Sequence, residues 1–474
     1  MKKRQALIIL FFVLSAQVVF AQVRDKDKSL KKIVESSSIS QKNLGLIVAN
    51  EHGETVFAVN ADKKFMPASL TKIITAAAAL EKFEVGHQFM TSVLAERSKI
   101  KKSILSGDLY LRGGGDAGFV SESMWFLVNE FMRSGIREVS GDIIVDDSRF
   151  DSVRFDLSRD QDRVDRAYDS PIGAMTFNWS AVNIFVRPGA KSGEPAVIFA
   201  DPESEYIRII NKTKTSAGSK SSIQVSNLGY NKKYKAEEIM VSGTMGLSAS
   251  EFVSYKSITK PEVWAGQQFR EFLKRRGVVV KGSVSSGVTP KSAEVVATYK
   301  SKPIGDLVYS MMKFSNNYIA EILTKNLGVE IKGEPGTMEK GVDVLRAYLK
   351  ESGVKDAEIF NPSGLSRKNK FAPNDILRIL LKVKNNFKVY PEYLSSLPIA
   401  GVDGTLKRRM GKDELNGQVR AKTGHLTGVA GLGGFASAPS GEMYSFIFLY
   451  NGGAKETYDS KVLFDKLVLE LLKP

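Results

Sequence analysis

Cysteine is absent from this 474-residue sequence, and histidine occurs only three times. Without cysteine the chain can form no disulfide framework, thiol nucleophile or thiolate metal site. His52, His87 and His425 do not have the spacing of zinc ligands, so there is no H-E-x-x-H motif, and a Ser-His-Asp triad has few candidate bases. We therefore expect an activity that needs neither a metal ion nor another cofactor.

Long apolar runs are also scarce, and the one that occurs lies at the start of the chain. Basic residues at positions 2 to 4 precede an apolar stretch from Ala6 to Phe20, and Ala21 completes a small-residue cleavage site. This pattern is typical of a bacterial secretory signal peptide. The stretch is short for a membrane span, which takes about 20 apolar residues. We expect residues 1–21 to be removed and the mature protein to be periplasmic, with an uncleaved anchor as the alternative.

Acidic residues are outnumbered in this sequence. The 68 lysines and arginines exceed the 52 aspartates and glutamates, and the net charge of +16 becomes +13 once the signal peptide is removed. Such a charge favours anionic partners such as nucleic acid, cell-wall polymer or a lipid surface. We expect no nucleic-acid partner, because the chain is exported and lacks a recognisable binding motif. At most a loose association with the membrane surface is expected, and a merely solvated cationic surface is the alternative.

The two ends of the chain show the same pattern, a hairpin and a helix. Alternating apolar residues on either side of short polar turns predict the hairpins, and helical periodicity predicts the helices. The predicted hairpin strands are Leu44–Asn50 with Thr55–Asn60 and Val429–Ala438 with Met443–Tyr450, and the predicted helices are Ile73–Leu80, Ile304–Leu327, Met338–Ser352 and Lys455–Leu472.

Short strand-like runs separated by glycine fill the middle of the chain, from about residue 86 to 297. Within them, residues 189–242 are poor in apolar side chains and rich in Lys, Ser and Asn, which indicates a nested subdomain. We therefore predict an α/β fold in which residues 22–85 and 298–474 form one domain. A mostly β insertion, residues 86–297, interrupts it.

A serine followed by a lysine three positions later can place a nucleophile and a base on one face of a helix. The lysine can act as a base only if burial lowers its pKa, because desolvation disfavours the ammonium ion. The pattern occurs at Ser29/Lys32, Ser98/Lys101, Ser257/Lys260, Ser310/Lys313 and Ser69/Lys72. Ser69/Lys72 differs from the others because it opens the most apolar helix of the chain, where a charged lysine is costly unless it is used or paired.

Two further tripeptides carry polar groups suited to the same chemistry. Ser315-Asn316-Asn317 can point a hydroxyl and an amide into one cleft, although a serine there is by itself more often a helix cap. Lys422-Thr423-Gly424, followed by His425 and a strand, offers a cation and a hydroxyl to a carboxylate, and its glycine permits close approach of a substrate. The order S-x-x-K, S-x-N, K-T-G is typical of an active-site-serine acyl-transfer fold, with the first motif on a core helix, the second on a loop between helices and the third on a strand near the C-terminus.

With these motifs in this order, the sequence resembles the penicilloyl-serine transferase superfamily. Within it, the sequence is similar to the low-molecular-mass class C penicillin-binding proteins, the D-alanyl-D-alanine carboxypeptidase/endopeptidase family, which carries a large insertion in the gap of 246 positions between Ser69 and Ser315. Further stretches that resemble family segments are Gly107–Leu111, Gly113–Asp116, Ser140–Ile143, Asn361–Ser366, Asp403–Leu406 and Val419–Gly424.

The resemblance implies a serine transpeptidase/β-lactamase-like domain whose central antiparallel sheet is flanked by helices. It also implies that Ser69 attacks the penultimate D-alanine carbonyl and that Lys72 accepts the serine proton. Ser315 and Lys422 would relay a proton to the departing amine, and Asn317 would hold the acyl-side amide.

The resemblance further implies the groups that bind the substrate. Lys422 and Thr423 would hold its carboxylate beside Gly424, and the backbone N–H groups of Ser69 and His425 would form the oxyanion hole. The expected partners are peptidoglycan stem peptides and β-lactam antibiotics, which would acylate the serine. Because D-Ala-D-Ala tails and D-Ala–diaminopimelate crosslinks both place a carboxylate one carbon from the leaving amine, we expect carboxypeptidase and endopeptidase activity.

The sequence also departs from the family pattern. Asn361-Pro362 replaces the usual Asp-Gly, and His425 replaces a small hydroxyl residue. Relatives have a tryptophan-flanked aspartate in the insertion, whereas here only Asp162 or Asp165, without tryptophan, could serve. A β-lactamase is one alternative, although Glu414-Leu415-Asn416 lacks the spacing of a deacylating Glu-x-x-Leu-Asn loop. A non-catalytic wall-binding or penicillin-sensing protein is the other.

Overall fold

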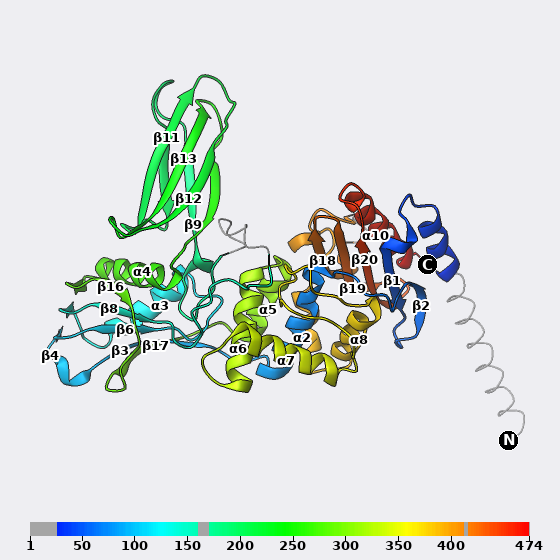
Figure 1. Cartoon of the computed structure of the whole chain (residues 1–474), viewed down its shortest axis with the longest axis horizontal. Coiled ribbons are helices and arrows are strands. Elements are labelled where there is room, and N and C mark those ends of the chain that lie inside the picture. Colours follow the sequence, from blue (N-terminus) through cyan, green and yellow to red (C-terminus); the bar gives the residue numbers. More distant parts are fainter. Residues whose placement is uncertain (1–25, 160–169, 412–415, 474) are drawn as a thin grey trace, which may run out of the picture. The chain divides into compact units, whose positions relative to one another are not determined.

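The structure is a computed structural model that describes residues 26–159, 170–411 and 416–473 (Figure 1). The predicted signal peptide, Asp162, Asp165 and Glu414 lie outside these residues. The chain divides into two compact units. The first unit comprises the chain up to Val85 with Val308–Asn316 and Leu345–Pro474, and the second comprises Gly86–Leu307 with Asn317–Val344.

A five-stranded antiparallel sheet forms the centre of the first unit. Its order joins both ends of the chain, because β20 pairs with β1 and Phe448 lies opposite Leu46. Both predicted hairpins are confirmed, one formed by β1 and β2 and the other by β19 and β20. In spatial order the strands are β18 (Val419–Leu426), β19 (Val429–Ser437), β20 (Met443–Asn451), β1 (Leu44–Ala49) and β2 (Thr55–Val59).

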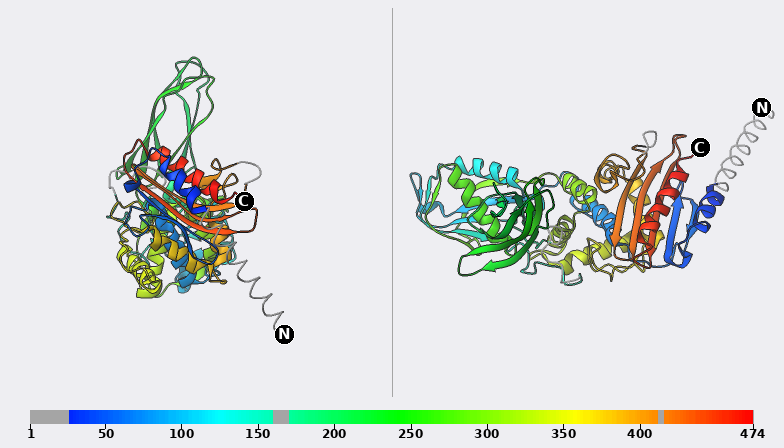
Figure 2. Two further views of the ribbon diagram at one scale, coloured as in Figure 1. Left: turned by 90° about the vertical axis from the view of Figure 1, so that its right-hand side faces the viewer. Right: turned by 90° about the horizontal axis from the view of Figure 1, so that it is seen from above.

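Helices cover this sheet. The helix α10 (Thr457–Leu471) packs against β19 and β20, and it lies beside the helix over residues 26–35, where Lys26 Nζ donates to Glu470 O at 3.2 Å (Figure 2). The helix α8 (Pro373–Lys384) packs against β20 and β1. The central strands are buried at nearly every position, as expected of strands with both faces covered.

The predicted core helix is confirmed as α2 (Thr71–Phe83). All its residues up to Leu80 are buried, which agrees with the absence of a polar face in the sequence. It contacts α8 and α9 (Tyr390–Ser396). The predicted final helix is also confirmed: α10 buries Leu463 and Leu467 under the sheet, so its apolar stripe serves the core of this unit.

The helical stretch predicted over Ile304–Leu327 is broken in the structure. It consists of α5 (Ile304–Lys313) and α6 (Asn317–Lys332), and α7 (Met338–Glu351) follows. The break lies at Ser315, whose φ of +55° is left-handed and cannot continue a right-handed helix. The apolar periodicity runs across this break and by itself indicates one helix, but the predicted position of the S-x-N motif on a loop between helices is confirmed.

Strands predominate in the second unit. A five-stranded sheet has the order β16-β8-β6-β3-β17, and a four-stranded sheet has the order β15-β7-β5-β4. The helix α3 (Ser121–Met132) packs on β17, and α4 (Pro261–Arg275) packs on β8 and β16. The strands are β3 (Met90–Ala95), β4 (Ile100–Lys101), β5 (Ile104–Leu105), β6 (Leu109–Arg112), β7 (Glu138–Val139), β8 (Ile143–Asp146), β15 (Val279–Val280), β16 (Val284–Ser286) and β17 (Glu294–Lys300).

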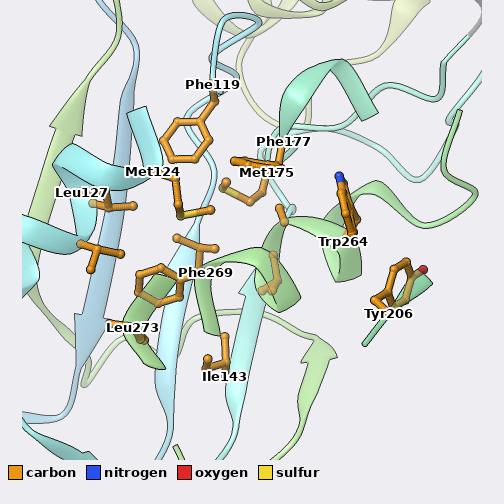
Figure 3. Close-up of a cluster of buried hydrophobic side chains, with 14 of the residues drawn as sticks. Phe119, Met124, Leu127, Ile143, Met175, Phe177, Tyr206, Trp264, Phe269 and Leu273 are labelled. Atoms are coloured by element: carbon orange, nitrogen blue, oxygen red, sulfur yellow. The ribbon is translucent and has the colours of Figure 1, made fainter. Parts of the chain in front are cut away.

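A single apolar core holds the second unit together (Figure 3). Trp264 of α4 is fully buried, with its ring 6.1 Å from that of Phe177 and 5.8 Å from that of Tyr206. Phe269, one turn further along α4, packs edge-on against Phe131 of α3 at 6.3 Å. Because Tyr206 directly precedes the strand β11 (Ile207–Ser216), this core anchors that strand of the predicted nested subdomain.

The predicted nested subdomain, residues 189–242, contributes strands to two three-stranded sheets, and two strands of the first sheet, β9 and β14, lie outside it. One comprises β10 (Val197–Asp201), β9 (Ala181–Arg187) and β14 (Phe252–Ser257). The other comprises β11 (Ile207–Ser216), β13 (Ala236–Gly246) and β12 (Gln224–Asn231). The predicted boundary at residue 242 falls inside β13.

The units and the predicted domains differ in two stretches. Residues 298–307 and Asn317–Val344 belong to the second unit, whereas the predicted catalytic domain included them. The domain boundaries at 86 and 297 therefore stay a proposal. In the described part of the chain, no helix combines the length and the apolar character needed to cross a bilayer.

Candidate active site

Ser69 lies in a short 3₁₀ turn, η2 (Ala68–Leu70), which leads directly into α2. The residue before it, Ala68, has a left-handed φ of +47°. Such backbone strain persists only where the surroundings fix it, and it is frequent at active sites. Lys72 follows in the first turn of α2, fully buried, and its Nζ donates to Ser69 Oγ at 3.1 Å. The structure thus brings together the predicted nucleophile and base.

The loop 361–364 closes over this pair. Lys72 Nζ donates to the Ser363 carbonyl at 2.5 Å, and Ser69 Oγ lies 3.5 Å from the same oxygen. Gly364 has a φ of +84°, and a Cβ atom on it would lie 1.9 Å from the Ala68 carbonyl oxygen. Glycine is therefore required at 364, because a side chain would collide with the backbone just before Ser69.

Asn361 shapes this loop, which explains one departure from the family pattern. Its side-chain Oδ1 accepts from Ser363 N at 3.0 Å and from Ser363 Oγ at 2.6 Å, a local turn that asparagine and aspartate both form. Asn369 Nδ2 donates to the Asn361 carbonyl at 2.7 Å, and Thr75 Oγ1 of α2 donates to the Pro362 carbonyl at 2.8 Å. The Asn-Pro sequence thus keeps a well-anchored turn.

A second pair consists of Ser315 and Lys422. Ser315 occupies the break between α5 and α6, and Lys422 lies on β18. The Lys422 side chain is fully buried, and its Nζ donates to Ser315 Oγ and to the Thr423 carbonyl, both at 2.8 Å. Burial lowers the pKa of Lys422 to about 7. This amine can therefore exist in both protonation states near neutral pH.

The two pairs lie on elements that pack against each other. The strand β18 contacts η2, and a Cβ atom on Gly424 would lie 2.8 Å from the Pro67 carbonyl oxygen and 3.0 Å from Leu70. Residues two apart on a strand project from the same face, so Lys422 faces the side on which Ser69 lies. Gly424 is needed for this close packing between strand and turn.

Among the described residues, β19 is the one strand that pairs with β18, so β18 has an outer edge. Ala421 N donates to the Pro398 carbonyl at 2.9 Å, and Ala400 N donates to the Val419 carbonyl at 3.0 Å, so these two residues of β18 direct their backbone groups away from β19. Backbone groups alternate along a strand, so those of Thr423 and His425 point to the same outer edge. The predicted oxyanion donor, the His425 N–H, is directed accordingly.

Thr423 has a neighbour that the sequence analysis did not single out. Its Oγ1 lies 2.8 Å from Oγ1 of Thr405 in η6 (Gly404–Leu406). A buried ion pair holds this turn, because Lys313 Nζ at the end of α5 contacts Asp403 Oδ2 at 2.6 Å. Burial lowers the pKa of Lys313, and the Asp403 carboxylate opposes that shift. The pair links the Thr405 turn to the Ser315 segment.

The His425 side chain is exposed at the end of β18. Desolvation and the nearby Lys461 ammonium of α10 lower its pKa. An uncharged ring in this position adds no fixed charge to the site. The replacement of a small hydroxyl residue by histidine is thus compatible with a role of the His425 backbone.

Asn317 is two positions after Ser315 and is the first residue of α6, where it is 7% exposed. It belongs to the second compact unit, whereas all the other predicted site residues belong to the first. Its role therefore stays a prediction. The aspartates suggested for substrate side-chain recognition, Asp162 and Asp165, lie outside the described residues.

Sequence reasoning missed Asn361, Ser363, Lys313, Asp403 and Thr405 as individual contributors. Four of them belong to stretches noted only for their family resemblance. The sequences Asn-Pro-Ser-Gly and Asp-Gly-Thr in these stretches are typical of turns. Lys313 occurs in one of the repeated S-x-x-K patterns, but nothing in the local sequence pairs it with Asp403.

Known proteins resemble this chain over nearly its whole length. The family model described as "D-Ala-D-Ala carboxypeptidase 3 (S13) family" matches residues 26–470. A D-alanyl-D-alanine carboxypeptidase of Actinomadura sp. (strain R39) is 31% identical over 91% of this chain and 82% of its own. The D-alanyl-D-alanine carboxypeptidase DacB of Haemophilus influenzae is 27% identical over 93% and 91%.

Solved structures confirm the predicted fold class. The crystal structure of penicillin-binding protein 4 (dacB) from Haemophilus influenzae matches with a TM-score of 0.79 and 25% identity, over 94% of this chain and 99% of that chain. The same protein in complex with a novel β-lactam matches with a TM-score of 0.74 over the same shares. The α/β fold with its antiparallel sheet and large, mostly β insertion is therefore shared with that protein.

Proposed function

The chain belongs to the D-Ala-D-Ala carboxypeptidase 3 (S13) family of serine peptidases, and from that premise we propose that it hydrolyses peptidoglycan peptides through an acyl-enzyme on Ser69. The observation that carries the proposal is the pair of hydrogen bonds, Lys72 to Ser69 and Lys422 to Ser315, on elements that pack together.

In the first step Ser69 Oγ attacks the penultimate D-alanine carbonyl carbon, and Lys72 accepts the hydroxyl proton. The oxyanion lies against the N–H groups of Ser69 and His425, and one such donor contributes about 3 kcal/mol. The C–N bond then breaks, and the proton taken up by Lys72 passes through the Ser315–Lys422 pair to the amine. Asn317 holds the acyl-side amide.

In the second step water attacks the ester, the acid is released and Ser69 regains its proton. Lys422, Thr423 and the outer edge of β18 hold the carboxylate of the leaving group during the first step. D-Ala-D-Ala tails and D-Ala–diaminopimelate crosslinks both have a carboxylate in that position, so we propose both carboxypeptidase and endopeptidase activity.

We also propose covalent binding of β-lactams. A β-lactam has a strained amide and a carboxylate arranged like the scissile amide and the carboxylate of the peptide substrate. Ser69 therefore opens the ring and keeps the acyl group. The structure of Haemophilus influenzae penicillin-binding protein 4 with a β-lactam supports this proposal through a relative.

The proposed location is the periplasm, with the signal peptide cleaved after Ala21, and the basic sequence allows at most a loose association with the membrane surface. We further propose that residues 22–85 with 298–474 act as the catalytic domain and residues 86–297 as an inserted domain.

The test is digestion of purified peptidoglycan, followed by chromatography of the muropeptides. We expect loss of terminal D-alanine and of crosslinked dimers, and no change with Ser69→Ala. Ser98→Ala is the matched control, because Ser98/Lys101 repeats the S-x-x-K spacing on an exposed turn. Intact muropeptides with the wild-type enzyme, or full activity of Ser69→Ala, would refute the proposal.

A further inference from the structure

The sheet of β11, β13 and β12 carries a long segment without acidic residues. Residues 207–236 contain six lysines and one arginine but no aspartate or glutamate, in a chain with 52 acidic residues. All six lysines are exposed: Lys212, Lys214, Lys220, Lys232, Lys233 and Lys235. Figure 1 shows the three strands side by side, with the turn between β11 and β12, which carries Lys220, at the end away from α4. Positive charge is thus concentrated on one small sheet.

The two carboxylates that directly follow this segment do not neutralise the lysines. Glu237 is fully buried and accepts hydrogen bonds from Asn227 at 2.8 Å and from the backbone N of Thr259 at 3.0 Å. Glu238 pairs with Arg208. In the part of the chain that the structure describes, none of the six lysines forms an ion pair with a carboxylate.

Hydroxyl and amide groups share a face with two of the lysines. In the sheet register Lys212 lies level with Ser242 and Gln224, and Lys214 lies level with Thr244, so these side chains project from one side. Ser222 Oγ lies 2.8 Å from Thr244 Oγ1. We call this surface the lysine–hydroxyl face: Lys212, Lys214, Ser222, Gln224, Ser242 and Thr244.

The opposite side of the same sheet belongs to the apolar core. Ile239, Val241 and Met245 of β13 are completely buried there. The core therefore accounts for one side of the sheet only. The lysine–hydroxyl face needs another explanation, because none of its members contributes to that core.

Protection of exposed strand edges does not account for most of this charge. Both β11 and β12 are edge strands, and charged side chains on edges, lysine above all, discourage pairing between sheets. Four of the six lysines, at positions 220, 232, 233 and 235, lie outside the strands. A segment of 30 residues with only positive charges instead favours an anionic partner.

We propose that the lysine–hydroxyl face binds the peptidoglycan polymer itself, outside the active site. The inference rests on the proposed function, which makes this polymer the substrate. Stem peptides carry free carboxylates that suit the lysine ammonium groups. The sugar hydroxyls and peptide amides of the polymer suit the serine, threonine and glutamine side chains.

A lipid surface fits these groups less well. Segments that lie on membranes combine basic residues with apolar side chains that enter the acyl region. The two rows of the lysine–hydroxyl face carry only lysines, hydroxyls and an amide. Attachment to the wall polymer at a second place would raise the effective concentration of stem peptides at Ser69.

The test is co-sedimentation of the full chain with purified peptidoglycan sacculi. All proteins carry Ser69→Ala, so that the sacculi stay intact. The test variant adds Lys212→Gln and Lys214→Gln on the lysine–hydroxyl face and Lys220→Gln in the adjoining turn between β11 and β12. The control adds Lys355→Gln, Lys388→Gln and Lys466→Gln, which remove the same charge from exposed positions of the other unit. Circular dichroism checks that both variants are folded.

We expect the test variant to bind sacculi about tenfold more weakly than the parent, and the control to change by less than about twofold, with all binding weakened by salt. Equal binding of parent and test variant overturns the proposal. Loss of binding to phosphatidylglycerol vesicles with unchanged binding to sacculi also overturns it, in favour of a lipid partner.

A second assay separates this proposal from the proposed function. With Ser69 present, the three Lys→Gln changes are expected to leave hydrolysis of a soluble D-Ala-D-Ala peptide unchanged. If the wild-type chain fails to cleave that peptide, the proposed function fails, whatever the sedimentation shows. If it cleaves the peptide and the test variant still sediments like the parent, only the wall-binding surface is refuted.

Discussion

Burial of Lys422 disfavours the charged form of its side chain. The ammonium form suits the carboxylate of the substrate, but desolvation lowers the pKa of this lysine to about 7. An amine that titrates near neutral pH can give up and regain a proton within one turnover. This is the property that a relay between Ser315 and the departing amine requires.

The lowered pKa of Lys422 predicts a basic limb in the pH profile. As pH rises through about 7, the side chain loses its proton and with it the attraction for the substrate carboxylate, so kcat/KM should fall. Lys422→Arg keeps the charge over the whole range, because arginine stays protonated. We expect this variant to be less active and to lack that limb, as measured by initial rates on a D-Ala-D-Ala peptide. A basic limb shared by both enzymes would contradict the assignment.

Thr405 is predicted to act through Thr423. Thr405→Val removes the hydroxyl that lies 2.8 Å from Thr423 Oγ1 and leaves that side chain free to turn. One such hydrogen bond contributes about 1 kcal/mol, so KM should rise about fivefold with little change in kcat. Thr427→Val, on an exposed turn, is the control. A fall in kcat at constant KM would argue against positioning of the carboxylate-binding hydroxyl.

Sequence reasoning could identify the residues whose chemistry is indicated by the residues next to them in the chain. Ser69 and Lys72 stand out because a lysine enters an alanine-rich apolar helix. The order of the three motifs indicates the other site residues. Lys313 could not be found in this way. Its partner Asp403 is 90 positions away, and only the folded chain shows that the two are in contact.

Among the elements, the loop 361–364 sets the position of Ser69. We expect Gly364→Ala to slow acylation by penicillin at least 100-fold, because its Cβ would lie 1.9 Å from the Ala68 carbonyl oxygen and φ is +84°. The left-handed residue should also cost about 1–2 kcal/mol of folding free energy. The acylation rate and the urea midpoint measure these two effects.

Gly453→Ala is the matched control for this glycine. A Cβ atom there has no neighbour within 4 Å, and φ is not in the left-handed region. Acylation and stability should both stay near the wild-type values. If Gly364→Ala behaves like Gly453→Ala, the loop does not constrain the nucleophile.

The final helix is predicted to stabilise the sheet. Leu467→Ala in α10 removes a fully buried side chain from the core of the first unit and should cost about 3 kcal/mol of unfolding free energy. Tyr458→Ala, at 73% exposure on the same helix, should change it by less than about 0.5 kcal/mol. Urea unfolding followed by circular dichroism measures both. Equal stability of the two variants would show that α10 is not part of the folded core.

Elements with a strong pattern were predictable, and interruptions were not. The hairpins and α2 follow from alternation and from a continuous apolar run. The break between α5 and α6 does not follow from periodicity, which continues through it, and only the S-x-N motif predicted a loop there. A left-handed residue such as Ser315 is stabilised by long-range contacts, here the hydrogen bond from Lys422.

At the scale of the whole molecule, similarity between the two chain ends predicted one sheet built from both. That prediction was correct because the edge strands of two hairpins can pair with each other, as β1 and β20 do. The boundaries of the nested subdomain were harder to predict from the sequence. Composition changes near residue 242, but β13 continues to Gly246 because it pairs with β11 along its full length.

Acylation by penicillin tests the central claim most directly, because it asks which hydroxyl the assembled site activates. Intact-mass spectrometry of the chain incubated with benzylpenicillin should show one added penicillin per molecule, and peptide mapping should place it on Ser69. Ser98→Ala should label normally and Ser69→Ala not at all. Labelling of Ser69→Ala, or an adduct mapped to another serine, would contradict the account.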